Sequence, residues 1–81
     1  MTDPLTGALE DATAQVAAVA DPVERFRAAR ERRAAITQAD RELTEIEKAV
    51  VWELYEGRTW AEVGKILGFS GSRAEAIARG R

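Results

Sequence analysis

Apolar residues recur at spacings of three and four along most of the chain, which is the period of an amphipathic α-helix. Near the N-terminus one such stripe consists of Leu5, Leu9, Ala12, Val16 and Val19. No segment alternates apolar and polar residues in the way that a half-buried β-strand does. The pattern therefore predicts an all-α fold, whose first helix runs from Leu5 to Val19 over roughly four turns.

A second helix is predicted to begin at Pro22. Asp21 suits the N-cap, proline suits the first helical position, and Glu24 completes the pattern of a capping box. The helix continues through alanine and arginine residues, which are good helix formers. Its apolar side comprises Phe26, Ala29, Ile36, Ala39 and Leu43. The first two helices are therefore expected to form a hairpin or an elbow at Asp21.

The end of the second helix is open to two interpretations. No Gly or Pro interrupts residues 23–55, so one continuous helix is possible. However, residues 44–47 (TEIE) form another capping-box pattern, which favours a break near Leu43. We therefore predict a separate third helix over about 45–56, ended by Gly57. Because apolar residues cover most of its circumference, this helix is expected to be buried on several sides.

A fourth helix is predicted to begin at Trp60, because the Thr and Glu that flank its first turn have the spacing of a capping box. Gly68 is expected to end this helix in the left-handed conformation that other residues resist. Ser70 then caps a fifth helix, which ends at Gly80. The apolar residues of the fourth helix that are expected to face inward are Val63, Ile66 and Leu67.

The last two helices have the residue pattern of a helix-turn-helix, a unit that lays its second helix in the major groove of DNA. In this pattern the two helices pack together at the fourth, eighth, tenth, fifteenth and eighteenth positions, counted from Trp60. These positions hold apolar residues, namely Val63, Leu67, Phe69, Ala74 and Ile77. Gly64 stands where the helices touch, and Gly68 stands in the turn. We interpret Trp52 and Trp60 as core aromatic residues rather than as groups that stack on bases.

The outer side of the fifth helix carries the residues expected to reach DNA. Those predicted to contact base edges are Ser72, Arg73, Glu75 and Ala76. Arg73 can pair in bidentate fashion with a guanine, and Glu75 can accept from a cytosine amino group. Those predicted to hold phosphates are Arg58, Lys65, Ser70, Arg79 and Arg81. The alternative for Glu75 is that it only neutralises Arg79, one helical turn on.

Charge is distributed unevenly along the chain, although the net charge is only −2. Residues 1–24 contain five acidic and no basic residues, whereas residues 25–33 have a net charge of +4. Residues 34–56 return to −4, and residues 57–81, which include the helix-turn-helix pattern, have +3. The end of the chain expected to face DNA is therefore basic. We interpret the arginine cluster at 25–33 as a solvated helix face, with phosphate contact as the alternative.

The composition argues against several classes of function. The 81 residues include no Cys and no His, so we expect no disulfide, no metal site, no cofactor and no enzymatic activity. No apolar run approaches the ~20 residues of a membrane span, and the N-terminus lacks the basic start of a signal peptide. We therefore expect a cytoplasmic, nucleoid-associated protein that does not contact a membrane.

A chain of this size is marginally stable alone, and self-association is a common remedy. One recognition helix also makes few contacts, whereas a two-fold dimer doubles them and reads half-sites about one helical turn apart. We expect a homodimer built by the apolar stripes of the first two helices, the second of which continues to Leu43. The residues assigned to dimerisation are Leu5, Leu9, Val16, Val19, Phe26 and Ile36.

From Leu43 onward the chain resembles region 4 of bacterial sigma factors. Residues 43–57 (LTEIEKAVVWELYEG) look like the first helices of that family, and residues 59–70 (TWAEVGKILGFS) are similar to its supporting helix and turn. The basic ending, residues 78–81 (ARGR), is also similar to the close of that domain. The resemblance covers about half the chain.

The resemblance implies that the fifth helix reads the −35 element of a promoter. The positions that would carry this role are Ser72, Arg73, Glu75 and Arg79. The chain has no room for the region that recognises the −10 element, so we do not expect a full sigma factor. The sequence resembles small repressors of plasmid or phage type, which have related helical domains, equally well.

Together these patterns predict one compact all-α domain of about five helices. It consists of an N-terminal helical pair over 1–42 and a trihelical helix-turn-helix unit over 43–81. The predicted function is sequence-specific binding of double-stranded DNA by a bacterial transcriptional regulator, with a recognition helix over about 71–79. The alternative is a protein-interaction module that docks on RNA polymerase or on another regulator, helped by the acidic residues 1–24.

Overall fold

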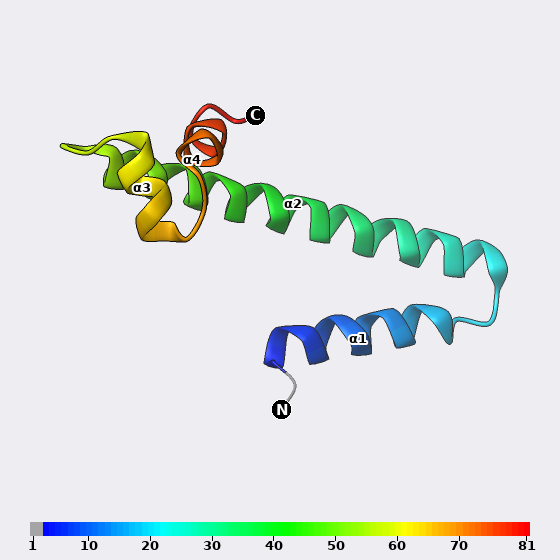
Figure 1. The fold of residues 1–81 in the computed structure, drawn as a ribbon. Coiled ribbons are helices and arrows are strands. Elements are labelled where there is room, and N and C mark those ends of the chain that lie inside the picture. Colours follow the sequence, from blue (N-terminus) through cyan, green and yellow to red (C-terminus); the bar gives the residue numbers. More distant parts are fainter. Residues whose placement is uncertain (1–2) are drawn as a thin grey trace. The chain divides into compact units, whose positions relative to one another are not determined.

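The computed structural model describes residues 3–81 and is all-α, as the sequence predicts (Figure 1). The helices of this described part are α1 (Pro4–Ala17), α2 (Pro22–Tyr55), α3 (Trp60–Leu67) and α4 (Gly71–Ala78). They number four rather than the predicted five, because the second and third predicted helices are one. By its internal contacts the chain forms two compact units, of which the first ends at Ala39 and the second covers Asp40–Arg81. The division between the units lies inside α2.

Aspartate caps begin both helices of the first unit. Asp3 accepts a hydrogen bond from the Thr6 amide through Oδ2 at 3.2 Å, and a proline follows it at the start of α1. Asp21 accepts from the Glu24 amide in the same way, at 2.9 Å, immediately before the proline that opens α2. Each side chain satisfies one of the amides that a helix N-terminus leaves unpaired. The predicted start of the second helix is confirmed.

The predicted break near Leu43 is wrong, because α2 continues without interruption to Tyr55. Thr44 does not cap a new helix but donates its hydroxyl to the carbonyl oxygen of Asp40, at 2.8 Å. Such a bond to the residue four positions earlier is compatible with the interior of a helix. Since the segment contains no Gly or Pro, nothing local forces the chain out of the helical conformation. Gly57, with a φ of 75°, leads the chain away after the helix has ended.

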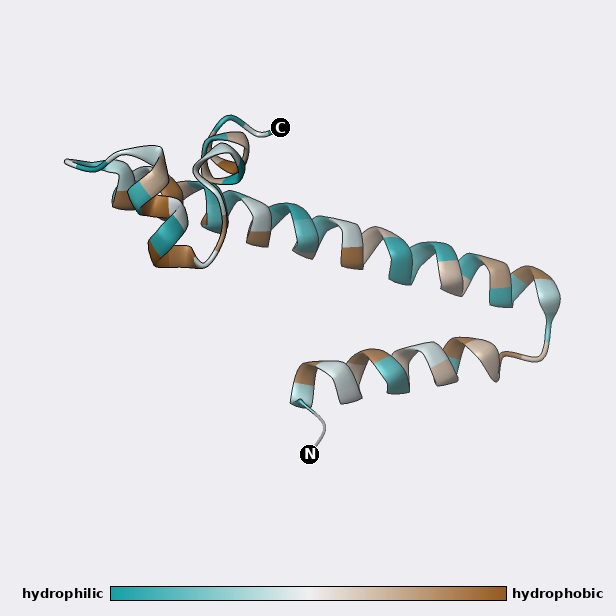
Figure 2. Ribbon diagram, viewed as in Figure 1, coloured by the Kyte–Doolittle hydropathy of each residue, from teal (hydrophilic) through white to brown (hydrophobic). Residues whose placement is uncertain are grey.

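The expectation that residues 45–56 are buried on several sides is also wrong. Val51 is only 2% exposed, whereas Ile46 and Trp52 are 60% and 43% exposed. This segment of α2 therefore contributes one narrow face to the core of the second unit. Figure 2 shows apolar residues interleaved with polar ones along α2. Within residues 3–81, no helix combines the length and the apolar character that a membrane crossing requires.

The core of the second unit is small and draws on all three of its helices. Its buried side chains are Val51, Val63, Ala74 and Ala78. Trp60 packs against this core and stacks on Tyr55, with 3.7 Å between the ring centroids. Trp52 donates from Nε1 to the carbonyl oxygen of Ala78 at 3.0 Å, which ties the end of α4 to α2. Trp60 is thus a core residue as interpreted, while Trp52 is anchored through its ring nitrogen and keeps part of its ring exposed.

Two glycines allow the backbones of α3, the turn and α4 to approach one another closely. A Cβ added to Gly64 would lie 2.5 Å from the carbonyl oxygen of Phe69. A Cβ added to Gly71 would lie 2.8 Å from the backbone nitrogen of Ala61. Both distances are shorter than any van der Waals contact of a carbon atom, so each position requires glycine. Gly64 therefore lies at a close contact, where the sequence pattern places a small residue.

Replacing Gly64 with Ala is expected to destabilise the second unit by about 1–3 kcal/mol, because the added methyl group must displace the backbone of the turn. Urea unfolding followed by tryptophan fluorescence measures this, since Trp52 and Trp60 both lie in the second unit. Gly7→Ala is the matched control, because nothing lies within 4 Å of the added Cβ. The control should leave the midpoint in place or raise it. An unchanged midpoint for Gly64→Ala would contradict the close approach.

Candidate nucleic-acid interface

Hydrogen bonds and backbone conformations at the helix ends fix the geometry of the helix-turn-helix. The side chain of Thr59 accepts from the Glu62 amide at 3.2 Å, and the Glu62 carboxylate accepts from the Thr59 amide at 3.3 Å. Gly68 ends α3 with a φ of 89°. Ser70 then begins α4 by accepting a hydrogen bond from the Arg73 amide, at 3.1 Å, through its hydroxyl oxygen. The capping box, the left-handed glycine and the second cap are all confirmed.

The apolar positions that lock the two helices are only partly covered. Those that are buried or half-buried are Val63, Phe69, Ala74 and Ile77. Leu67 and Ile66 are 39% and 54% exposed, so the prediction that both face inward is wrong. The physical reason lies in α4, whose residues 74, 76 and 78 are all alanine and have little side-chain volume to lay over α3.

The four residues predicted to contact bases differ in exposure. Ser72 and Arg73, in the first turn of α4, are exposed, whereas Glu75 and Ala76 are half-buried. The small residues at 74 and 78 face the core, which directs the first two residues away from it. The exposed polar end of α4 is therefore its N-terminal turn.

Arg73 also makes a contact that the sequence analysis missed. Its guanidinium carbon lies 5.7 Å from the centroid of the Phe69 ring, which is the geometry of a cation–π interaction. Phe69 is half-buried in the turn and packs against the core of the second unit. The signal that could have found it is the spacing of four residues between an aromatic ring and a cation. The contact holds the guanidinium near the start of α4.

Glu75 and Arg79 are joined by an ion pair, with 3.1 Å between Oε1 and Nε. Their side chains are 37% and 50% exposed. The structure therefore contains the ion pair that the alternative interpretation of Glu75 expects, while the contact of Glu75 with a base stays a prediction. Solvent-accessible pairs of this kind contribute about 0–1 kcal/mol, so a phosphate or a base can compete for either partner.

The remaining residues predicted to hold phosphates are exposed and lie at four different places in the second unit. They are Arg58 after α2, Lys65 on α3, Ser70 before α4 and Arg81 at the end of the chain. Arg58 is held in place, because its Nη1 donates to the carbonyl oxygen of Leu54 at 3.0 Å. Within the described residues, the side chains of Lys65 and Arg81 have no ion-pair partner. Their charges are accordingly available to an external anion.

The comparisons with known proteins give no relative. No protein-family model, no curated protein and no solved structure matches the chain. In the part of the chain that the structure describes, no cluster of acidic side chains has the arrangement of a metal site. We therefore infer the function from the geometry of the second unit.

The cap at Ser70 gives a direct test of how α4 is positioned. Ser70→Ala is expected to lower the free energy of unfolding by about 0.5–2 kcal/mol, because the Arg73 amide loses its partner. Ser72→Ala is the matched control, since Ser72 is exposed and lies inside the helix, where alanine is well tolerated. Urea unfolding of the two variants should separate them clearly. Equal stability would show that Ser70 does not fix the start of α4.

Proposed function

We propose that the second unit binds double-stranded DNA in a sequence-specific manner and that the protein is a transcriptional regulator. The observation that carries the proposal is the exposed N-terminal turn of α4, with Ser72 and Arg73, on a helix whose opposite side is fixed by Ala74 and Ala78. A helix-turn-helix protein contacts base edges with the N-terminal residues of its second helix. These are the residues that α4 exposes.

Arg73 has the central role in this proposal. A guanidinium group can pair with the O6 and N7 atoms of a guanine through two parallel hydrogen bonds. At an exposed site the cation–π contact with Phe69 is worth only about 0.5–1 kcal/mol, so the arginine can leave the ring for a base. Ser72 is small enough to approach a base or a phosphate, and the methyl group of Ala76 can contact a thymine methyl. Glu75 can accept from a cytosine once its pair with Arg79 opens.

Affinity in this proposal comes from contacts with the phosphate backbone. The residues assigned to it are Arg58, Lys65, Ser70, Arg79 and Arg81. Residues 57–81 carry a net charge of +3, although the whole chain is at −2, so the unit presents a basic segment to DNA. The resemblance of residues 43–81 to region 4 of sigma factors supports the same assignment of α4. Such a regulator would act at the nucleoid.

A second candidate function has an observation of its own. In the second unit the apolar side chains of Ile46, Val50, Ile66 and Leu67 are exposed, and none of them belongs to α4. Apolar side chains left exposed in this way can contribute to a protein-binding surface. The unit would then dock on RNA polymerase or on another regulator, whether or not it also reads DNA.

Selection from random double-stranded DNA separates the two candidates. DNA binding predicts an enriched motif, and Arg73→Ala should weaken binding to that motif by about 1–3 kcal/mol while relaxing the preference at one position. Arg41→Ala is the control, because Arg41 is an exposed arginine of the same unit that is not assigned to DNA. If a folded protein enriches no motif, the DNA-binding proposal is wrong and the protein-binding candidate is favoured.

A phosphate contact makes a different prediction for Lys65. Lys65→Ala should weaken binding to all sequences to a similar extent and reduce the slope of log K against log salt by roughly 0.9. Fluorescence anisotropy of a labelled duplex at several salt concentrations measures both effects. Arg41→Ala again serves as the control and should keep the wild-type slope. A slope that Lys65→Ala leaves unchanged removes this residue from the phosphate contacts.

A further inference from the structure

The first unit contains helices but no core of its own. No residue of α1 is buried, and the one buried residue of α2, Val51, belongs to the second unit. The apolar residues of this unit that remain exposed are Leu5, Leu9, Val23, Phe26 and Ile36. Helices of ordinary propensity are held in water mainly by burial of one apolar face. The unit therefore exposes the apolar face that would normally be buried in a core.

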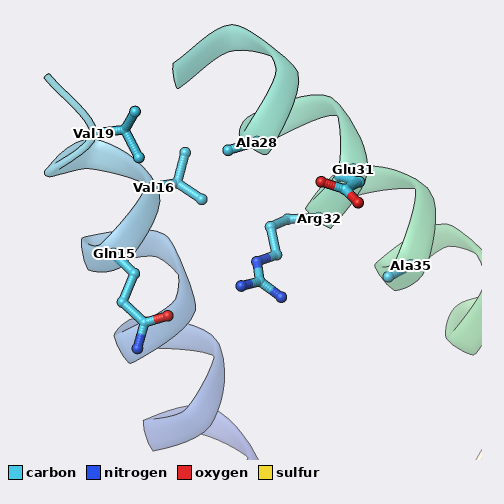
Figure 3. A pocket seen from close by; sticks show the side chains of 7 residues that line it. All are labelled: Gln15, Val16, Val19, Ala28, Glu31, Arg32 and Ala35. Atoms are coloured by element: carbon cyan, nitrogen blue, oxygen red, sulfur yellow. The ribbon is translucent and has the colours of Figure 1, made fainter. Parts of the chain in front are cut away.

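This face is hollowed between α1 and α2. A groove of about 530 Å³ has a mainly apolar floor, to which Leu9 and Val16 of α1 and Ile36 of α2 contribute. A neighbouring hollow of about 490 Å³ is shown in Figure 3, where Val16 points toward Ala28 and the side chain of Arg32 extends into the space between the helices. The space between the two helices is thus open and largely apolar.

The rim of the groove is positively charged, and α1 carries charges of the opposite sign. Arg25, Arg32 and Arg33 line the groove together with its apolar floor. The sequence of α1 contains Glu10 and Asp11 and no basic residue. Among the described residues the ion pairs are local, within α2 or within α4, and none joins α1 to the arginines. The groove therefore suits an acidic amphipathic helix, which is what α1 is.

We propose that this face is a homodimer interface, in which the α1–α2 hairpins of two copies pack face to face. The acidic side of α1 in each copy then lies against the arginine rim of the other, and the apolar floors cover one another. Four of the residues that the sequence assigns to dimerisation belong to this face, because Leu9, Val16 and Ile36 line the groove and Val19 lines the neighbouring hollow. Leu5 and Phe26, which have the same assignment, are exposed and line neither. The dimer proposal does not depend on DNA binding, and the experiments that test it contain no DNA.

Analytical ultracentrifugation of the full chain tests the interface. At high micromolar concentration the wild type is expected to have a mass of about 18 kDa, twice that of one chain. Ile36→Asp should raise the dimer dissociation constant by roughly 100-fold or more, since each copy would bury an aspartate among apolar side chains. Ile66→Asp is the matched control, because Ile66 is 54% exposed against 51% for Ile36 and lies in the second unit. The control should remain a dimer.

A pair of charge-reversal variants tests the partner without adding polar groups to the groove. One variant carries Glu10→Lys and Asp11→Lys, and the other carries Arg32→Glu and Arg33→Glu. Each alone should be predominantly monomeric, while an equimolar mixture should form a heterodimer, because the reversed charges match again across the interface. Circular dichroism of each variant checks that the helices persist.

Several results would overturn the proposal. A wild-type chain that is monomeric at high micromolar concentration shows that a second copy does not cover the groove. Dissociation by Ile66→Asp but not by Ile36→Asp places the interface elsewhere. Two charge-reversal variants that stay folded and do not combine show that α1 does not meet the arginines of another copy.

Discussion

The close backbone approach at Gly64 is the constraint on which the second unit depends. With no Cβ at this position, the carbonyl oxygen of Phe69 can come against α3, and the turn folds back within three residues. The same approach explains why the core contains only two valines and two alanines. Small side chains at 74 and 78 suit helices whose backbones already lie close together. The orientation of α4, and with it the exposure of Arg73, follows from this contact.

The elements that the sequence predicts correctly are those set by interactions within four residues. The hydroxyl of Thr59 or Ser70 finds its amide partner in the next turn, and Gly68 adopts its left-handed conformation without help from distant segments. The break near Leu43 fails for the converse reason. The pattern at residues 44–47 is equally compatible with a cap and with a helix interior, where Thr44 bonds back to Asp40. Whether Thr44 caps a helix or lies inside one is therefore decided by the rest of the fold and not by these four residues.

Burial was harder to predict than helicity, because it depends on how much side-chain volume the neighbouring elements supply. The apolar residues at 46, 50, 66 and 67 have a core-like pattern in sequence, yet α4 is too short and too rich in alanine to cover them. In the candidate interface, the exposure of Ser72 and Arg73 follows from helical periodicity once Ala74 and Ala78 are assigned to the core. The contact between Arg73 and Phe69 is indicated by their spacing of four residues, but helical periodicity does not predict it, since Phe69 lies in the turn and not in a helix.

Each unit lacks contacts that association with a second copy would supply. In the proposed DNA complex, a recognition helix of eight residues would offer few contacts, while specific sites usually require roughly 4–10 kcal/mol over non-specific binding. The first unit has exposed apolar side chains, and among the described residues no ion pair joins the acidic α1 to the arginines that line the groove. Pairing two copies through the first unit covers that surface and brings a second α4 into the same particle. Because α2 runs from one unit into the other without a break, the helix that would build the interface also supplies Val51 to the core beneath α4.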